Sequence, residues 1–503
     1  MHEGTNHSLR GTDRAALAER YDAIAYAALP HPLSHPDRLA TVATFLGMNP
    51  PPVSRCRVLE VGCSDGANLI PMAETLPAGH FLGCDLSPSA IVKGRATIAA
   101  LGLTNIALVE EDLSSLAPEH GDFDYIIAHG IYSWVPAHVR DCLFALAAAR
   151  LSPEGVMFVS FNALPGCRVR QATWEILHWH VDRIADPHER LRAAREFASL
   201  IATGGKSLHD ADEAMRAEFR SIAQSSDSEL FHDTLAVPND PVYFHEFAAQ
   251  AGRHGLKYLA EAELHTMSAA GLSAEARAFL SPLDPEAREQ YLDFVRLRRF
   301  RQALVRRSTA SIDMATRSQR LFAMHAAADA SLLQAAAEGK TVEFARGLDP
   351  SGAGIPGIHG LLDTLVRRSP AACPVAMLRE NIGTFTLPRP LESILTDMYV
   401  SNIVNFHVHP PSLAATAGER PVCRPLARLE ARTQESLTCL LHSRVRIPDA
   451  NARYLITLLD GTRDRASLAS ALADRAFGRQ RDEAGRFVTH ALEQFGRMAL
   501  LTA

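Results

Sequence analysis

In the front third of the chain, apolar runs alternate with helical stretches. This alternation is the sequence feature that most restricts which fold the chain can adopt. Strands that are apolar nearly throughout and alternate with helices predict a parallel sheet with helices on both faces. In such sheets, ligands bind beyond the carboxyl ends of the strands. The five runs are "RVLEV" (57–61), "HFLGCDL" (80–86), "IALVEED" (106–112), "FDYIIAH" (123–129) and "VMFVSFN" (156–162).

A glycine-containing turn follows the first predicted strand. The strand runs into Glu60, Gly62, Ser64, Gly66 and Asn68. Two glycines allow the backbone to turn tightly and to approach a ligand closely. The helix that follows presents free N–H groups at its amino end. These groups suit a phosphate or the carboxylate of an amino-acid-like cofactor.

Acids end the next two predicted strands. Asp85, followed by Leu86, stands about 20 residues beyond the glycine turn, where an acid commonly binds ribose hydroxyls. Asp112, followed by Leu113, ends the third strand and is placed to receive an adenine amino group. Each signal is weak alone, because a strand-end Asp is often only a helix cap. Together and in register, the signals predict a nucleotide-type site.

This pattern of Glu-x-Gly-x-x-x-Gly, then Asp85, then Asp112 resembles class I S-adenosyl-L-methionine (SAM) methyltransferases. It differs from the NAD pattern Gly-x-Gly-x-x-Gly because an acid precedes the first glycine. The resemblance implies an α/β, Rossmann-like, seven-stranded sheet and SAM as cofactor without a metal. It also implies that Glu60 orients the site, that Gly62 and Gly66 line the methionine end, and that Asp85 and Asp112 hold ribose and adenine.

Several longer stretches are similar to a narrower bacterial group, the methyltransferases with a methyltransferase regulatory domain. This group includes rickettsial lysine methyltransferases that act on outer membrane protein B. The resemblance implies protein-lysine methylation of a protein or peptide substrate. The stretches are "YDAIAYAALPHPLSHPDRLATVATFLGM" (21–48), "HGIYSWVP" (129–136), "VSFNALPG" (159–166) and "PVYFHEFAAQAGRHGLKYLAEAEL" (241–264).

Two positions depart from the pattern of these families. Ser64 stands where the class usually has glycine, and a serine fits there without strain only if its backbone dihedral angles are ordinary. Cys167 stands where relatives often have Trp, which removes one aromatic ring from the acceptor side. If its backbone is strained, the serine predicts reduced affinity for the cofactor.

The resemblance also implies a domain plan. We expect "LKYLAEAEL" and "RFRQALVRR" to be the sixth and seventh strands. Apolar residues at helical spacing predict a helical insertion, through which the family likeness implies a homodimer. Tyr21 and Tyr26 form either a lid over SAM or part of an anchored helix. The plan is an N-terminal helical lid (1–50), a SAM-binding core (51–310), an insertion (about 186–237) and a regulatory segment (about 225–310).

The stretch "HGIYSWVP" lies just past the fourth strand, where the transferring methyl should point. Aromatic faces attract ammonium and sulfonium groups and keep a pocket partly dry, which lowers the pKa of a lysine amine. We therefore expect His129, Tyr132 and Trp134 to face the methyl and its acceptor. Two alternatives remain: Trp134 packs against the next helix, and His129 acts as an acid/base group.

From about residue 311 the alternation of strands and helices stops. The remaining patterns predict two mostly α, winged-helix-like domains (311–415 and 416–503). Such folds often bind DNA, but the net charge of −6 and candidate recognition helices without a basic stripe argue against nucleic acid. The run "RYLITLLDGTRDRASLASAL" resembles peptide-recognition domains and favours a polypeptide substrate.

Bulk features favour a cytoplasmic protein. The start of the chain is polar and unlike a signal peptide, and no apolar run of about 18 residues is present. The eight cysteines form no CxxC pair, which suits reduced thiols. Two other functions stay open: methylation of a small molecule or cell-envelope metabolite, and SAM binding by a catalytically weak regulator or scaffold.

Overall fold

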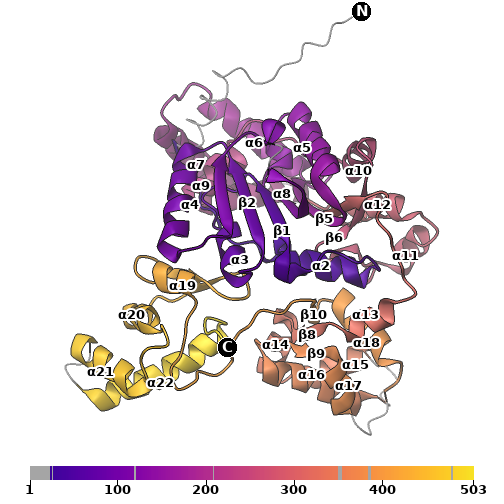
Figure 1. The fold of residues 1–503 in the computed structure, drawn as a ribbon. Coiled ribbons are helices and arrows are strands. Elements are labelled where there is room, and N and C mark those ends of the chain that lie inside the picture. Colours follow the sequence, from indigo (N-terminus) through magenta and orange to yellow (C-terminus); the bar gives the residue numbers. More distant parts are fainter. Residues whose placement is uncertain are drawn as a thin grey trace, which may run out of the picture.

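The chain forms an α/β region followed by two mostly helical regions (Figure 1). The computed structural model describes residues 23–24, 26–117, 120–207, 209–348, 354–382, 387–476 and 480–503. In the described part of the chain, no helix is long and apolar enough to cross a membrane.

One seven-stranded sheet with strand order β3-β2-β1-β4-β5-β7-β6 forms the front region. The first five strands pair in parallel, while β7 is antiparallel to both β5 and β6. The predicted fold class and the predicted sixth and seventh strands are therefore confirmed. The strands are β1 (Arg57–Val61), β2 (His80–Asp85), β3 (Ile106–Glu110), β4 (Phe123–Ala128), β5 (Leu151–Asn162), β6 (Leu256–Glu261) and β7 (Phe300–Arg307).

Both faces of this sheet are buried, which explains the apolar runs in the sequence. Because neighbouring residues of a strand point to opposite faces, Val58 and Leu59 enter different hydrophobic clusters. Tyr125 and Ile126 divide in the same way on the adjacent strand. Helices cover both faces, among them α2 (Pro36–Phe45), α3 (Leu69–Thr75), α4 (Pro88–Leu101), α5 (Ala137–Arg150) and α10 (Phe244–Arg253).

Local capping signals set the bounds of several helices. The Ser87 hydroxyl accepts a hydrogen bond from the Ala90 N–H and begins α4, and Gly102 with a φ of +66° ends this helix. The insertion has its own hydrophobic core, which contains apolar residues such as Leu191 and Phe219. Its elements are α7 (Pro187–Thr203), α8 (Asp210–Gln224), α9 (Asp227–Glu229) and the π-helix η6 (Leu230–Thr234), and the preceding α6 (Arg168–Val181) packs against them.

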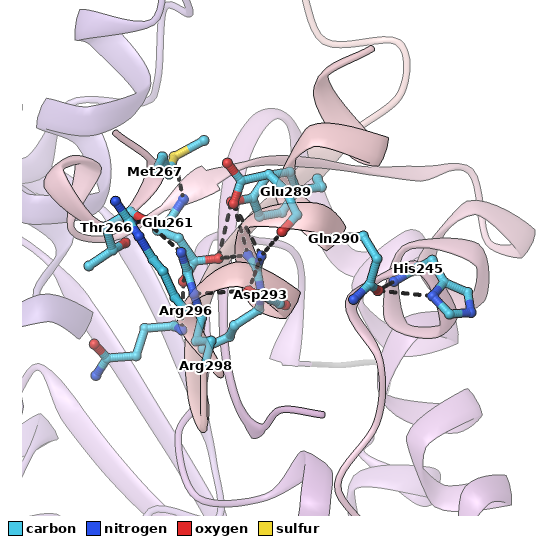
Figure 2. Close-up of polar contacts among 12 residues, drawn as sticks. His245, Glu261, Thr266, Met267, Glu289, Gln290, Asp293, Arg296 and Arg298 are labelled. Carbon is cyan, nitrogen blue, oxygen red and sulfur yellow. Dashed lines mark hydrogen bonds and ion pairs between the residues drawn. The ribbon is translucent and has the colours of Figure 1, made fainter. Parts of the chain in front are cut away.

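A buried cluster of charges joins β6 and β7 to α12 (Pro285–Arg296), which follows α11 (Ala274–Leu280). Figure 2 shows Glu261, Glu289 and Asp293 converging beside Arg298. At the centre is the fully buried Arg301, whose guanidinium makes two hydrogen bonds of 2.8 Å to the Asp293 carboxylate. It also binds Glu261 and Glu289. These contacts fix the far edge of the sheet.

The middle region contains the predicted three helices and strand, α16 to α18 and β10, and adds β8 and β9, which are too short to show a pattern. It contacts α2, where His407 Nδ1 lies 2.7 Å from Asp37 Oδ2. Its elements are α13 (Arg317–Phe322), β8 (His325–Ala328), α14 (Ala330–Ala337), α15 (Thr341–Leu348), α16 (Ile355–Arg368), β9 (Cys373–Pro374), α17 (Val375–Ile382), α18 (Leu391–Val400) and β10 (Val404–His407).

The C-terminal region lies below α3 in Figure 1. It packs helices around a separate core and carries one antiparallel hairpin of two strands. Its elements are α19 (Pro425–Glu430), β11 (Ser436–Thr438), β12 (Arg444–Arg446), α20 (Ala450–Leu458), α21 (Arg465–Ala476) and α22 (Arg481–Arg497).

Candidate active site

A cavity of about 410 Å³ lies at the carboxyl ends of the first four strands. This volume suits a small ligand such as a nucleoside derivative. Residues from the turns after β1, β2, β3 and β4 and from the end of the insertion line it. They include Tyr26, Val61, Gly62, Ser64, Asp65, Asp85, Leu86, Lys93, Asp112, Leu113, His129, Gly130, Ile131, Trp134, His232, Asp233 and Pro238.

The turn after β1 is strained at one position. Gly62 and Gly66 have φ angles of +70° and +76°, which glycine adopts without penalty. Ser64 has a φ of +49°, a left-handed conformation that costs a non-glycine residue roughly 1–3 kcal/mol. Ordinary dihedral angles, the condition for an unstrained serine here, are therefore not met. The Ser64 N–H donates a 2.7 Å hydrogen bond to Asp85 Oδ2, which helps to hold the turn.

The Asp85 carboxylate accepts hydrogen bonds from the turns after β1 and β2, and it also lines the cavity. Its Oδ2 accepts from Ser64 N and its Oδ1 accepts from Ser87 N at 2.9 Å. Each carboxylate oxygen has two lone pairs, so the group has acceptor capacity for ligand hydroxyls as well. Asp85 is therefore placed both to shape the turn and to bind a ligand.

Asp112 accepts two hydrogen bonds from Ser114, one from its backbone and one from its side chain. Its Oδ1 accepts from Ser114 N at 2.8 Å and from Ser114 Oγ at 2.7 Å, which caps the short turn η3 (Leu113–Ser115). The side chain also lines the cavity, next to Leu113. The capping and the ligand-binding interpretations of this acid are thus compatible.

Behind the lining residues lies a buried polar pair. Glu60 and Asn68 are each 4% exposed, and Asn68 Nδ2 donates to Glu60 Oε1 at 2.7 Å. Glu60 Oε2 has no hydrogen-bond partner within the described residues. Burial, together with nearby Asp85 and Asp65, raises the pKa of Glu60 to about 8 despite the Asn68 hydrogen bond. A buried orphan acceptor fits a donor such as the amino group of a methionine-derived cofactor.

Glu60→Gln should make stability less dependent on pH. The pKa of Glu60 is raised from 4.5 to about 8 in the folded chain, so its contribution to stability is full below pH 4.5 and is lost as pH rises through 8. From pH 6 to pH 8, the free energy of unfolding of the natural chain should fall by about 2–3 kcal/mol more than that of the variant. Chemical denaturation at the two pH values measures this, and equal slopes would contradict it.

His129 and Trp134 line the cavity, as their predicted place after β4 requires. Burial, and then the nearby His31, lower the pKa of His129 to about 3. The two imidazoles have ring centroids 3.7 Å apart. His129 is therefore neutral near pH 7 and a poor proton acceptor, which argues against an acid/base role. The Trp134 indole N–H is buried and has no hydrogen-bond partner within the described residues, so the ring faces the cavity with its apolar surface.

Tyr132 does not face the cavity, and the prediction that it does is wrong. Its side chain is 1% exposed, and its hydroxyl donates to Gln250 Oε1 at 2.6 Å. The ring packs against Phe161 and Phe247 in the core. Tyr132 and Trp134 belong to a 3₁₀ turn with three residues per turn, so side chains two positions apart point in different directions.

The insertion supplies cavity residues that the sequence patterns did not indicate. His232 and Asp233 lie in the π-helix η6, and Pro238 follows it. Such π-helical turns occur frequently at functional sites, but a helical pattern in sequence does not reveal them. Tyr26 lines the cavity, whereas Tyr21 lies outside the described residues.

The strand order, the reversed β7 and the cavity at the strand ends are together those of a class I SAM-dependent methyltransferase. Models of three protein families match the chain. They are a methyltransferase domain at residues 58–155, a predicted methyltransferase regulatory domain at 226–307, and a PKMT C-terminal winged helix domain at 419–481. The chain belongs to the class I SAM-dependent methyltransferases with a methyltransferase regulatory domain.

The chain is similar in sequence to two proteins of Rickettsia prowazekii. The chain is 34% identical to the uncharacterized protein RP789 of Rickettsia prowazekii over 312 residues, which are 60% of this chain and 56% of that protein. It is 32% identical to RP028 of the same organism over 243 residues, 48% of this chain and 96% of that protein. The match thus spans little more than half of RP789.

The fold also matches a solved structure over nearly its whole length. PKMT2 from Rickettsia typhi superposes with a TM-score of 0.81 at 23% identity, covering 95% of this chain and 100% of that one. A second structure of PKMT2, in complex with AdoHcy, superposes with a TM-score of 0.80 at 22% identity. At this level of identity, the likeness shows the common fold.

Proposed function

We propose that this chain transfers a methyl group from SAM to the side-chain nitrogen of lysine in a polypeptide. The observation that carries this is the make-up of the cavity wall: a neutral aromatic surface from His129 and Trp134 meets an acid, Asp233, from the insertion. An acid attracts an ammonium group, and aromatic faces bind this group and partly exclude water from it. The match to a PKMT winged helix domain supports a protein substrate.

We assign the cofactor contacts from the geometry of the strand ends. SAM supplies an electrophilic methyl on a sulfonium when bound. Asp85 would accept from the ribose hydroxyls and Asp112 from the adenine amino group, while Glu60 would orient the methionine end. Gly62 leaves the backbone of the turn open there, and Tyr26 would cover the ligand from the N-terminal segment.

The acceptor lysine must lose a proton before transfer. With a pKa near 10.4, this costs roughly 4–5 kcal/mol at neutral pH in water. Because His129 has a pKa of about 3, it would act as a neutral wall rather than as a base. We therefore assign recognition of the incoming ammonium to Asp233 and to the face of Trp134, whose contact contributes about 0.5–2 kcal/mol.

Trp134→Ala should lower kcat/KM for the polypeptide substrate by about tenfold, because the aromatic face that would contact the ammonium is lost. SAM affinity should change by less than about threefold, since the strand-end acids remain. Trp134→Phe keeps the face and should retain most of the activity. Steady-state kinetics and calorimetry separate the two effects, and unchanged kcat/KM in the alanine variant would exclude Trp134 from the acceptor site.

The acceptor class can be tested directly. Purified chain is incubated with methyl-labelled SAM and fractionated bacterial lysate, and the label is traced to polypeptides or to small molecules. Label in acid-stable lysine derivatives of a protein is the expected result. Label only in small molecules would support a metabolite methyltransferase, and saturable SAM binding without any transfer would support a regulator or scaffold.

The proposal extends to assembly and location. The exposed apolar side chains of α6 and α7, among them Trp179 at 82% exposure, favour a homodimer through the insertion and the adjoining α6, which light scattering would detect. The eight cysteines are free thiols, which favours a reducing cytoplasm. The net charge of −6 disfavours a nucleic-acid partner.

A further inference from the structure

The C-terminal region binds α3, the helix that directly follows the glycine turn, through hydrogen bonds and an ion pair. Arg424 is 2% exposed, and its Nε donates to Glu74 Oε2 at 2.7 Å. Its Nη2 donates to the Pro71 carbonyl at 3.1 Å, and the Leu426 N–H donates to Glu74 Oε1 at 2.7 Å. These contacts are buried and charge-assisted, so they are of the strong kind. The region is therefore fixed at the second half of α3.

The hairpin β11–β12 of the same region reaches the other end of α3. His442, at the hairpin turn, is buried, and its Nε2 lies 2.8 Å from Oδ1 of Asn68, the residue before α3. His442 has a φ of +56°, a left-handed conformation that is unfavourable for a residue other than glycine. Such a conformation persists only where surrounding contacts enforce it. The hairpin turn is thus held against the methyltransferase region.

The other hydrogen bonds of Asn68 show which group is the donor in the contact between His442 and Asn68. Its Nδ2 donates to Glu60 Oε1, and its Oδ1 accepts from the His31 N–H at 2.8 Å. The amide is therefore oriented with its oxygen toward His442, and the His442 Nε2 must carry the hydrogen. Burial lowers the pKa of His442 well below its usual range, in keeping with a neutral ring. An unbroken chain of hydrogen bonds runs from His442 through Asn68 to Glu60.

We propose that His442 is a positioning residue of the cofactor site: through Asn68 it fixes the carboxyl group of Glu60, so that docking of the C-terminal hairpin strengthens SAM binding. This inference rests on the proposed contact between SAM and Glu60. In winged-helix proteins that bind nucleic acid, elements of this domain face a partner. Here the hairpin turn faces the methyltransferase region of its own chain. A protein that engages the C-terminal region would then change SAM affinity, because coupling between two sites is reciprocal.

The test compares three variants of the full chain by calorimetric SAM titration and thermal unfolding. His442→Leu keeps the volume but removes the N–H, and should weaken SAM binding by about threefold to tenfold, the effect of one buried hydrogen bond. His442→Gln offers an N–H at similar reach and should restore affinity to near that of the natural chain. Leu441→Ala alters the neighbouring, 39% exposed residue of the same turn and should leave SAM affinity unchanged.

A purely structural role would lower the melting temperature of His442→Leu and leave its SAM affinity within about twofold of the natural value. That result would overturn the inference, as would a glutamine variant no better than leucine. Hydrogen exchange of residues 436–446 in the natural chain is a second test, which does not depend on any variant folding. S-adenosylhomocysteine should slow this exchange, and unchanged exchange at saturation would also overturn the coupling. If the natural chain binds no SAM, the proposed function itself fails.

Discussion

Asp85→Ala should weaken SAM binding by at least about a hundredfold. The carboxylate accepts from the Ser64 N–H and the Ser87 N–H, and it lines the cavity where we place the ribose. Hydrogen bonds to a charged group contribute about 1.5–3 kcal/mol each, so losing the two that we expect from the ribose hydroxyls exceeds the energy of a hundredfold change in affinity. The strained backbone at Ser64 also loses the acceptor that holds it.

Calorimetric titration of SAM measures this effect. Asp85→Asn keeps the shape and one oxygen but presents an amide nitrogen to one of the two N–H donors, so its affinity should fall between those of the natural chain and the alanine variant. Asp363→Ala removes an exposed acid of the middle region and serves as the matched control. Affinities of Asp85→Ala and Asp363→Ala that agree within about threefold would show that the strand-end acid does not bind the cofactor.

Arg301→Met should destabilise the fold by about 3–5 kcal/mol, the usual effect of removing one partner from a buried ion-pair network. The guanidinium is fully buried and binds three carboxylates, those of Glu261, Glu289 and Asp293. Without it, Arg298 is the remaining cation that contacts this cluster among the described residues. Buried carboxylates that lose their counter-charge then face repulsion and desolvation together.

The loss in free energy of unfolding caused by Arg301→Met should become smaller as pH falls. Burial already raises the pKa of Glu289 to about 7, although Arg301 opposes this. Because the pKa of Glu289 is raised from 4.5, its stabilising contribution is full below pH 4.5 and is lost as pH rises through 7. Loss of Arg301 raises this pKa further, so the variant should be closest to the natural chain near pH 5 and furthest from it near pH 8.

Denaturant unfolding at these two pH values provides the measurement. Arg367→Met, which breaks an exposed i,i+4 pair with Asp363, is the control and should change the free energy of unfolding by less than about 1 kcal/mol. A loss for Arg301→Met as small as that of the control would mean that the buried cluster adds nothing to stability.

Local patterns in the sequence were sufficient for the sheet and for the cofactor end of the cavity. The runs at 57–61 and 80–86 are buried on both faces, so their composition records their place in the fold. Gly62 and Asp85 lie within one or two residues of a strand end, where strand direction alone brings them to the same edge of the sheet. Their positions therefore followed from strand boundaries.

Other features depend on short turns or on distant segments, which patterns do not encode. The 3₁₀ turn after β4 directs Tyr132 into the core while Trp134 lines the cavity. Asp233 enters from a π-helix of the insertion, and His442 reaches Asn68 across 374 residues of sequence. No periodicity in either segment points to its partner.

The account depends most on one claim, that SAM occupies the cavity at the ends of β1 to β4. A crystal structure of the chain with S-adenosylhomocysteine at saturating concentration tests it directly. We expect the ligand in this cavity, with its ribose against Asp85 and its adenine beside Asp112. A ligand bound elsewhere, or an empty cavity under these conditions, would contradict the account.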